Sequence, residues 1–315
     1  MIPCSPVGFV GIGVIGSRIV RRLLDNGRSV IVYDVNHEAV AKASALGAGT
    51  AETLMSLAQQ CDVVLLSLPT SRAVREVVEG TEGLLRSGKP LLIADLSTNS
   101  PTECQRLSYI CAATGGTFID CPLTGGIVGA EKGTFTAMVG AGLQGLARLL
   151  PVLEIFCTRI VHVGPAGHGA AAKLIHNMLG EIQVHSMAEA LCLAAKVGLD
   201  VPRVCDVLAN GMATSRVFTE LYARAGLKRR FLPPIASVSQ ARKDQELLTE
   251  MADAAGVELS LTPTVMRNLQ QLCEMGLGAH DVTSVLLLYE QALQVECPEV
   301  DLASSPAHGG APGSR

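Results

Sequence analysis

The stretch Val7-Gly8-Phe9-Val10-Gly11-Ile12-Gly13-Val14-Ile15-Gly16 decides the fold of this chain. Residues 7–10 predict a short apolar strand, and the glycines at positions 11, 13 and 16 have the spacing of a tight turn that leads into a helix. In such a turn the first glycine permits the sharp bend, the second lets a pyrophosphate approach the backbone, and the third lets helix and strand pack closely. We therefore expect residues 11–16 to bind the phosphates of a dinucleotide at the amino end of a helix.

The second apolar run ends at Tyr33-Asp34, and Asp34 lies 18 residues beyond Gly16. An acidic residue about 20 residues after the glycines typically accepts hydrogen bonds from the adenosine ribose. Its charge would repel a 2′-phosphate, and the following residues, Val35-Asn36-His37-Glu38, include no arginine that could bind one. The sequence therefore favours NAD over NADP as the cofactor.

Farther along, the pattern of the chain changes once. Up to about residue 165, apolar runs alternate with segments of helical periodicity, which predicts βαβ units around a largely parallel sheet. From about Ala170 to Val197 one long helical stretch follows, and strand patterning does not return. We expect an α/β fold in which residues 1–165 form an N-terminal Rossmann dinucleotide-binding domain and residues 166–297 form an all-α C-terminal domain. The Pro-, Gly- and Ser-rich residues 298–315 are expected to be disordered.

The composition excludes several classes of protein. Hydrophobic residues make up 48% of the 315 residues, which is too many for a disordered chain. The formal net charge is −4 and the densest basic cluster is only Lys228-Arg229-Arg230, so we expect no nucleic-acid partner. Apolar stretches are shorter than a membrane helix requires and no signal peptide is recognisable, so we expect a cytoplasmic protein without membrane contact. The ten cysteines include no C-x-x-C pair, so we expect neither a metal site nor a redox dithiol.

Two further segments follow predicted strands: Leu68-Pro69-Thr70 and Asp95-Leu96-Ser97-Thr98. An open α/β sheet binds its ligand at the carboxyl ends of its strands, so both segments are candidates for cofactor contacts. Taken alone, each also has the composition of an ordinary turn.

Two longer blocks complete the pattern: Asp120-Cys121-Pro122-Leu123-Thr124-Gly125-Gly126, and Gly167-His168-Gly169-Ala170-Ala171-Ala172-Lys173-Leu174-Ile175-His176-Asn177. A Gly-Gly turn exposes backbone N–H groups, which suits an anion. Lys173 and Asn177 are four residues apart, so they share one face of the expected helix. With residues 8–16 and 95–98, these blocks make the chain resemble the β-hydroxyacid dehydrogenase family, the group of 3-hydroxyisobutyrate dehydrogenase and tartronate semialdehyde reductase, with 6-phosphogluconate dehydrogenase as a larger relative.

The resemblance spans roughly residues 7–295 and implies contacts to both ligands. Thr98 matches a threonine near the nicotinamide. Leu68 and Pro69 are assigned to the same cofactor site because they follow a predicted strand, and not because of the resemblance. Thr124, where the family has serine, would bind the substrate carboxylate together with the backbone amides of Gly125 and Gly126. The threonine keeps the hydroxyl donor, while its extra methyl group narrows the pocket.

The resemblance also implies the catalytic groups. Lys173 matches the general base of the family, and Asn177 matches the residue that orients the substrate. A lysine desolvated beside a cofactor can have a lowered pKa, which suits proton transfer. His176 stands where the family commonly has asparagine, and it is either a substrate contact or a helix neighbour that points elsewhere. Lys243, within Arg242-Lys243-Asp244, matches a lysine that reaches toward the cofactor.

The resemblance therefore implies an NAD-dependent oxidoreductase that acts on the CH–OH group of a small carboxylate and forms homodimers or homotetramers through its helical domain. One alternative is an NADP-dependent imine or ketone reductase, which Lys173 and Asp34 argue against. Another is a non-catalytic dinucleotide-binding scaffold, which would need neither Lys173 nor Asn177. The physiological substrate and the direction of the reaction stay open, since 3-hydroxyisobutyrate, tartronate semialdehyde, threonate and 4-hydroxybutyrate all fit.

Overall fold

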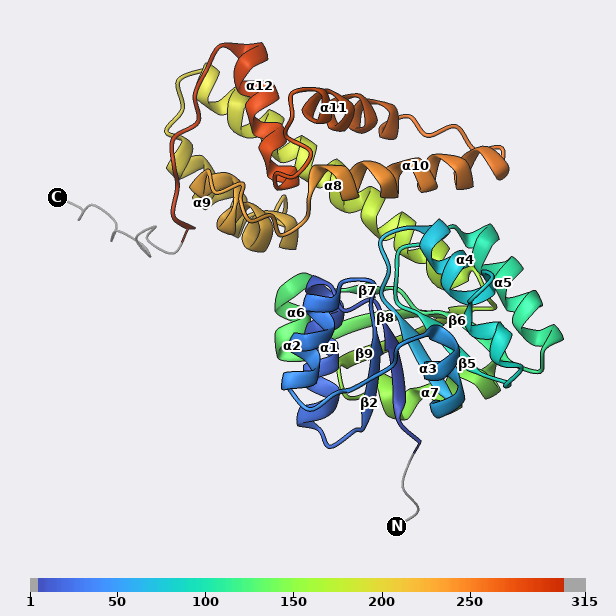
Figure 1. Cartoon of the computed structure of the whole chain (residues 1–315). Coiled ribbons are helices and arrows are strands. Elements are labelled where there is room, and N and C mark those ends of the chain that lie inside the picture. Colours follow the sequence, from blue (N-terminus) through green and yellow to red (C-terminus); the bar gives the residue numbers. More distant parts are fainter. Residues whose placement is uncertain (1–4, 303–315) are drawn as a thin grey trace. The chain divides into compact units, whose positions relative to one another are not determined.

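The computed structural model describes residues 5–302 (Figure 1). Contacts divide the chain into two compact units, Met1–Ile175 and His176–Arg315, called the sheet unit and the helical unit below. Helix α8 (His168–Lys196) begins in the first unit and continues into the second, so the division lies within a single helix. The boundary expected at residue 165 lies directly after the last strand. The tail was expected to be disordered from residue 298, which is wrong for its first part: Val300 is buried in the helical core and donates its amide hydrogen to the Leu227 carbonyl oxygen at 2.8 Å. The rest of the tail, from residue 303, lies outside the described residues.

One sheet contains the nine strands found among the described residues: β1 (Val7–Val10), β2 (Val30–Tyr33), β3 (Gly49–Thr50), β4 (Val63–Leu66), β5 (Leu92–Asp95), β6 (Thr117–Asp120), β7 (Leu123–Thr124), β8 (Phe135–Gly140) and β9 (Cys157–Gly164). Their order is β3-β2-β1-β4-β5-β6-β8-β7, with β9 paired to β8. The strands from β3 to β6 pair in parallel, whereas β8 is antiparallel to β6 and β7. The carboxyl ends of β1, β4, β5 and β6 therefore lie side by side at one edge of the sheet, called the carboxyl edge below.

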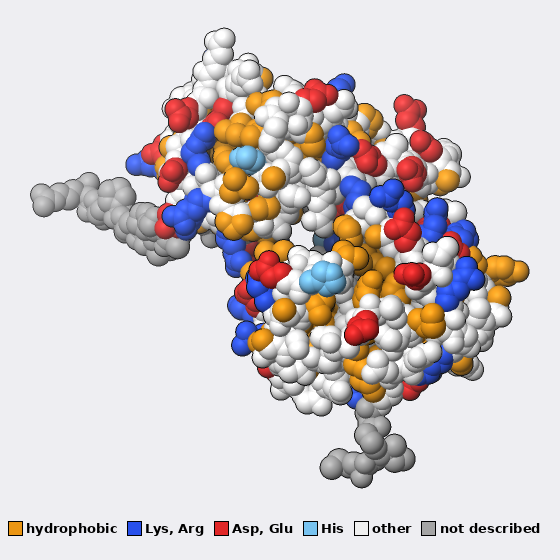
Figure 2. Space-filling model, viewed as in Figure 1, with side chains coloured by type: hydrophobic (Ala, Val, Ile, Leu, Met, Phe, Trp, Pro, Cys, Tyr) orange, Lys and Arg blue, Asp and Glu red, His pale blue; other side chains and the backbone are white. Residues whose placement is uncertain are grey.

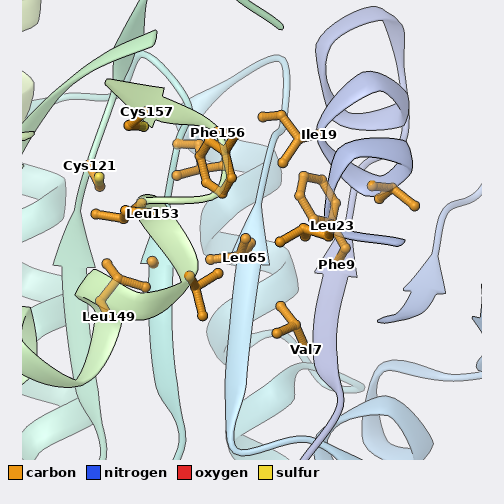
Figure 3. Packing of buried hydrophobic residues seen from close by; sticks show 14 of the residues in the cluster. Val7, Phe9, Ile19, Leu23, Leu65, Cys121, Leu149, Leu153, Phe156 and Cys157 are labelled. Carbon is orange, nitrogen blue, oxygen red and sulfur yellow. The ribbon is translucent and has the colours of Figure 1, made fainter. Parts of the chain in front are cut away.

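Helices pack on both faces of this sheet: α1 (Val14–Asp25), α2 (His37–Ala45), α3 (Leu54–Gln60), α4 (Ser71–Glu79), α5 (Pro101–Ala113), α6 (Gly126–Lys132) and α7 (Leu143–Leu153). Alternate residues of a strand point to opposite faces. In β1, Phe9 belongs to a buried cluster with Ile19 of α1 and Leu149 of α7 (Figure 3), whereas Val10 belongs to a second cluster with Leu57 of α3. A largely parallel sheet with helices packed on both faces is a Rossmann arrangement, so the predicted N-terminal fold is confirmed.

The glycine turn fixes where the first helix begins and ends. α1 starts at Val14, directly after the second glycine of the motif, and buries Ile19, Val20 and Leu23 against the sheet. It ends before Gly27, whose φ of 74° lies in the left-handed region that glycine adopts readily. The strand, the turn and the helix are thus consecutive, as the sequence predicts.

The helical unit contains most of α8 together with α9 (Val201–Asn210), α10 (Val238–Ala254), α11 (Thr262–Glu274) and α12 (Leu286–Leu293). Shorter helical turns cover Val217–Tyr222, Gly226–Lys228 and Val282–Val285. Its core joins Leu191 of α8, Leu269 of α11 and Leu286 of α12. No strand occurs among the described residues after Gly164, so the predicted all-helical C-terminal region is confirmed.

The surface carries charges of both signs. Acidic and basic side chains are interspersed over the face that Figure 2 shows. Within residues 5–302, no helix combines the length and the apolar composition needed to cross a lipid bilayer.

Candidate active site

The glycine turn lies at the carboxyl end of β1, and two of its glycines are required by packing inside the protein. Gly11 has a φ of 89°, and a side chain there would collide with the Ser67 carbonyl oxygen. A side chain on Gly16 would collide with the carbonyl oxygen of Gly11. At Gly13, in contrast, an added Cβ would meet no protein atom within 4 Å. Packing alone gives no reason for glycine at position 13, but a pyrophosphate approaching the backbone does.

Asp34 is held beside this turn by backbone N–H groups. Its Oδ2 accepts a hydrogen bond of 2.7 Å from the Ile12 amide, and its Oδ1 accepts one of 2.8 Å from the Asn36 amide. The carboxylate therefore joins the end of β2 to the glycine turn. This places an acidic group where the adenosine ribose of a dinucleotide is expected, and each oxygen keeps a second lone pair for a ribose hydroxyl.

A cavity of about 260 Å³ lies beside the turn. Its lining comes from the glycine turn, from α1 and from α2: Ile12, Gly13, Val14, Ser17, Asn36, Glu38, Ala39, Lys42, Ala43 and Leu46. The sequence did not single out Lys42, which pairs with Glu38 at 2.7 Å on an exposed helix face. The cavity has apolar groups from α2 on one side and the glycine turn on the other, which is where the adenosine end of a dinucleotide is expected.

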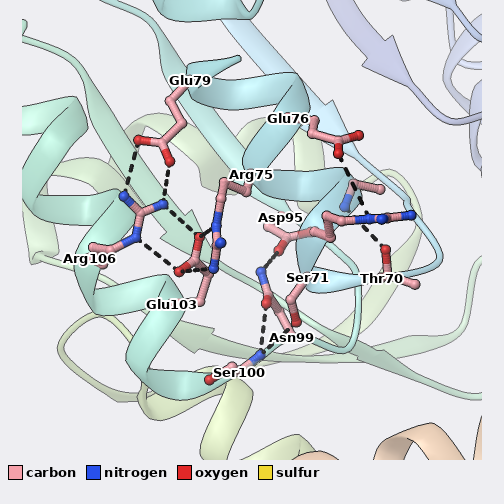
Figure 4. Close-up of polar contacts among 12 residues, drawn as sticks. Thr70, Ser71, Arg75, Glu76, Glu79, Asp95, Asn99, Ser100, Glu103 and Arg106 are labelled. Carbon is pink, nitrogen blue, oxygen red and sulfur yellow. Dashed lines mark hydrogen bonds and ion pairs between the residues drawn. The ribbon is translucent and has the colours of Figure 1, made fainter.

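The turns after β4 and β5 are joined by a buried polar network. Leu68 donates its amide hydrogen to Ser97 Oγ at 2.8 Å, so the segments at 68–69 and 97–98 lie side by side. Asp95 accepts from the Ser97 amide at 3.0 Å and from Asn99 Nδ2 at 2.9 Å (Figure 4). Burial raises the pKa of Asp95 to about 6, and the nearby Asp120 carboxylate adds to the shift. The network fixes the turn that carries Thr98, while Pro69 is exposed.

An ion-pair network joins α4 to α5 behind these turns (Figure 4). Glu103 accepts hydrogen bonds from Arg75 Nε at 2.8 Å and from Arg106 Nε at 2.9 Å. Arg106 also donates to Glu79 at 2.6 Å. Hydrogen bonds from Arg106, joined by those from Arg75, lower the pKa of Glu103 to about 2. These side chains hold the two helices that follow the Leu68 and Thr98 turns.

The proposed carboxylate-binding segment forms the end of β7 and the start of α6. Gly125 has a φ of 134° and Gly126 a φ of 58°, a pair of values that side-chain-bearing residues rarely adopt. Both glycines are exposed, and Thr124 is half-buried beside them. The backbone N–H groups of these two residues therefore have no side chain of their own in front of them, which suits the binding of an anion. The sequence predicted the turn but not the helix that follows it.

Asp120, at the end of β6, holds the beginning of α8. Its side chain is 1% exposed, and it accepts hydrogen bonds from the amides of Gly167 at 2.7 Å and Ala170 at 2.8 Å. Burial raises the pKa of this carboxyl, while the backbone hydrogen bonds oppose the shift. An added Cβ at Gly169 would lie 2.7 Å from the Asp120 carbonyl oxygen, so the helix can approach the sheet this closely only with glycine there. The first turn of α8 is thus fixed to the carboxyl edge.

The catalytic candidates lie one and two turns farther along α8. Lys173 belongs to the sheet unit and is half-buried, and Asn177 follows one helical turn later as part of the helical unit. Asn177 donates from Nδ2 to Asp244 Oδ2 at 2.7 Å, and its Oδ1 lies 3.1 Å from the exposed His176 Nδ1. Because a carboxylate can only accept, Asp244 fixes which end of the Asn177 amide is the nitrogen.

Lys243 and Asp244 both lie on α10 of the helical unit. The Lys243 ammonium lies 3.1 Å from Asp244 Oδ1. The sequence singled out Lys243 but not Asp244, whose contact to Asn177 joins residues 67 positions apart. The sheet unit therefore contains the glycine turn with Asp34, the adjoining Leu68 and Thr98 turns, the Thr124 segment and Lys173. His176, Asn177 and Lys243 belong to the other unit.

Comparison with known proteins places this arrangement among dehydrogenases. The family model for the NAD binding domain of 6-phosphogluconate dehydrogenase matches residues 6–164, and the model for the NAD-binding region of NADP-dependent 3-hydroxyisobutyrate dehydrogenase matches residues 167–289. The chain is 31% identical over 286 residues to the 2-(hydroxymethyl)glutarate dehydrogenase of Eubacterium barkeri, a match that covers 90% of this chain and 95% of that protein. It is 37% identical over 206 residues to the 3-hydroxyisobutyrate dehydrogenase of Pseudomonas aeruginosa, covering 65% and 69% of the two chains. The structure of the Mycobacterium tuberculosis 3-hydroxyisobutyrate dehydrogenase with L-serine superimposes with a TM-score of 0.83 at 27% identity, covering 90% of this chain and 98% of that one.

Proposed function

The chain belongs to the β-hydroxyacid dehydrogenase family, and from that membership we propose that it oxidises a small β-hydroxyacid with NAD, using Lys173 as the general base. The coarser activity follows from its relatives: the chain is an NAD(P)-dependent oxidoreductase that acts on a CH–OH group. The finer points, which are the cofactor, the substrate and the residues that act on it, are the proposal.

The observation that carries the proposal is the pair of hydrogen bonds from the Gly167 and Ala170 amides to Asp120. They fix the first turn of α8 to the carboxyl edge of the sheet, where the glycine turn and the Thr98 turn also lie. Lys173 is three residues beyond Ala170, or about one turn of helix. The base is therefore carried by a helix whose start is anchored at the edge that the cofactor needs.

The proposed reaction assigns one task to each group. Thr124 and the backbone of Gly125 and Gly126 bind the substrate carboxylate. Asn177 orients the β-hydroxyl group, whose proton passes to Lys173 as the carbonyl forms. NAD, when bound, supplies the acceptor for the hydride that leaves the same carbon. The protein contributes position and electrostatics rather than redox chemistry of its own.

The names of the relatives suggest the class of substrate. 3-Hydroxyisobutyrate, 2-(hydroxymethyl)glutarate and the serine bound to the mycobacterial enzyme each carry a CH2OH group on the carbon next to a carboxylate. They differ only in the second substituent on that carbon. We propose that the substrate of this chain shares the CH2OH–CH–COO⁻ unit.

The preference for NAD rests on Asp34. Its carboxylate is fixed by the Ile12 and Asn36 amides at the expected ribose position, and it would repel a 2′-phosphate. The exposed Lys42 in the same cavity is paired with Glu38, which reduces its attraction for a phosphate. We therefore keep NAD as the preferred cofactor.

The remaining alternatives differ from the proposal in the role of Lys173. An imine or ketone reductase would not need a base at this position, and a scaffold would need neither the lysine nor the anion-binding turn. Oligomerisation and a cytoplasmic location stay predictions of the sequence.

The test is a panel of hydroxyacids in which absorbance of the reduced nicotinamide is followed with NAD and with NADP in parallel. The panel contains 3-hydroxyisobutyrate, serine, glycerate and 2-(hydroxymethyl)glutarate, with 4-hydroxybutyrate and threonate as acids that lack the shared unit. We expect turnover with members of the first set and a higher kcat/KM with NAD. No turnover with any acid of the first set would contradict the reaction, and a strong preference for NADP would contradict the role given to Asp34.

A further inference from the structure

The helical unit holds a buried polar cluster next to Asn177. It includes Glu181 on α8, Asp244 and Gln245 on α10, and Asp281 before the 3₁₀ turn Val282–Val285. Within the described residues, Glu181 Oε2 and Gln245 Nε2 are buried without a hydrogen-bond partner, and the equally buried Asp244 Oδ1 lies 3.1 Å from the Lys243 ammonium. Buried polar atoms are normally paired, so a cluster of unpaired ones calls for an explanation.

Glu181 is the residue of this cluster that is most altered by its surroundings. Burial raises the pKa of Glu181 to about 8, and the Asp244 and Asp281 carboxylates add to the shift. At neutral pH the group is therefore a protonated carboxyl with an O–H to donate. The Asp244 and Asp281 carboxylates can only accept hydrogen bonds. A proton on Glu181 therefore removes the repulsion between Glu181 and these two groups, and it provides an O–H that one of them can accept.

Two titratable groups close to Glu181, His185 and Tyr222, are uncharged at neutral pH. His185, one turn farther along α8, lies with Nδ1 2.9 Å from the Glu181 carbonyl oxygen, and burial lowers its pKa to about 4, so it is neutral. Tyr222 is fully buried, donates to the Val184 carbonyl oxygen at 2.7 Å, and has a raised pKa, so it is neutral as well. Lys243 pairs with Asp244 at 3.1 Å, so the positive charge nearest to the described contacts of this cluster lies on the Asp244 side.

The cluster is connected to the proposed site through Asn177. Lys173, Asn177 and Glu181 are spaced four residues apart along α8, which puts them along one side of the helix. Asp244 receives the Asn177 Nδ2 hydrogen at 2.7 Å and also interacts electrostatically with Glu181. Asp244 is thus the group that Glu181 and Asn177 have in common.

We propose that Glu181 is a positioning residue whose protonated carboxyl holds the Asp244 carboxylate in place, so that Asp244 keeps the Asn177 amide in the orientation the reaction requires. When Glu181 loses its proton, three carboxylates repel one another in a buried space, Asp244 shifts, and Asn177 loses its fixed orientation. The proposal deepens the proposed function, because the effect on turnover requires that Asn177 orient the substrate.

The first measurement needs no substrate. The side-chain NH2 resonance of Asn177 is followed by NMR from pH 6 to pH 10 in the full chain with NAD, and it is assigned from its loss in Asn177→Asp. We expect the resonance to move with an inflection near the value of about 8 for Glu181. In Glu181→Gln, whose amide cannot ionise, the inflection disappears. Glu189→Gln, an exposed residue on the same helix, is the matched control and keeps it.

The second measurement is the pH dependence of kcat for the substrate found in the panel. At pH 7, Glu181→Gln keeps kcat within about threefold of the parent, because a neutral amide replaces a neutral carboxyl of the same shape. Above pH 8 the activity of the parent falls by up to about tenfold per pH unit, whereas that of Glu181→Gln does not.

An Asn177 resonance without an inflection near pH 8, in the parent protein itself, overturns the proposal even if the variant fails to fold. So does an inflection that persists in Glu181→Gln. If no hydroxyacid is turned over, the proposed function fails while the NMR titration still decides the role of Glu181.

Discussion

Asp120 of the sheet unit and Glu181 of the helical unit are both buried acids with a raised pKa, yet the protein satisfies them differently. Each oxygen of Asp120 receives a backbone N–H, from Gly167 and from Ala170. Glu181 Oε2 has no hydrogen-bond partner among the described residues, and the groups that interact with it are side chains. Burial disfavours the charged form in both cases, but only Asp120 has fixed N–H groups that favour it.

Whether a buried acid can respond to pH depends on the groups that hold it. Backbone N–H groups are fixed by the fold, so an acid that accepts hydrogen bonds from them connects two elements in a fixed arrangement. Side chains can move, so an acid held by them can respond to pH. Asp34 follows the first pattern, with N–H donors at 2.7 Å and 2.8 Å, and the Asn177–Asp244 contact follows the second.

The largest effect is expected from the base carried by the helix that Asp120 anchors. Lys173→Ala should lower kcat by about a thousandfold or more, because a positioned general base contributes roughly that much. Binding of NAD, measured by fluorescence titration, should stay nearly unchanged. Lys196→Ala, an exposed lysine near the end of the same helix, is the control and should keep full activity. A Lys173→Ala enzyme within tenfold of the parent on a good substrate would show that another group is the base.

The connection that Asp120 makes is tested by Asp120→Asn. The asparagine oxygen can accept a hydrogen bond from only one of the two amides, Gly167 or Ala170. The asparagine NH2 group would then face the N–H of the other amide. We expect a loss of about 3 kcal/mol of unfolding free energy, typical of a buried charged acceptor left badly paired. The Tm should fall by about 5–10 °C, as followed by circular dichroism.

Asp25→Asn provides the matched control for this connection. Asp25 is exposed and pairs with Arg21 at 3.8 Å, so its loss should leave the Tm almost unchanged. A similar small change in Asp120→Asn would mean that Gly167 and Ala170 do not depend on the Asp120 charge, and the contrast with Glu181 would lose its basis.

Asp34 tests whether a backbone-held acid also selects the cofactor. Asp34→Asn keeps an acceptor for the Ile12 amide but removes the charge that opposes a 2′-phosphate. The ratio of kcat/KM with NAD to that with NADP should fall by about tenfold or more, since specificity of this kind rests on repulsion. Glu38→Gln, an exposed acid in the same cavity that is paired with Lys42, should change the ratio by less than about threefold. Equal effects of the two substitutions would assign the selectivity to overall charge rather than to Asp34.

The sequence could predict the elements and the turns because their signals are local. The strand, the glycine turn and the helix after it all lie within residues 7–25, and the helical pattern of α8 depends only on its own periodicity. The partners of these elements could not be predicted in the same way. Asp120 meets α8 across 47 and 50 positions, and Asn177 meets Asp244 across 67. Such contacts depend on how elements pack, and periodicity along the chain contains no information about that.

The smallest effect is expected at Glu103, which is held by the arginine side chains of Arg75 and Arg106. Its side chain is only 7% exposed, but Arg75 and Arg106 are 53% and 38% exposed, so solvent screens the pairs. Glu103→Gln should therefore cost about 1–2 kcal/mol of unfolding free energy at pH 7.

The hydrogen bonds from Arg106 lower the pKa of Glu103 to about 2 from an ordinary value of 4.5, so the folded state binds its proton less tightly than the unfolded state. The contribution is present above pH 4.5 and is lost as the pH falls toward 2, where urea titrations of parent and variant should converge. Glu76→Gln, which removes an exposed pair to Arg72 at 3.8 Å, should leave the curve unchanged at every pH. A Glu103→Gln deficit that persists at pH 2.5 would mean that packing, and not charge, holds α4 to α5.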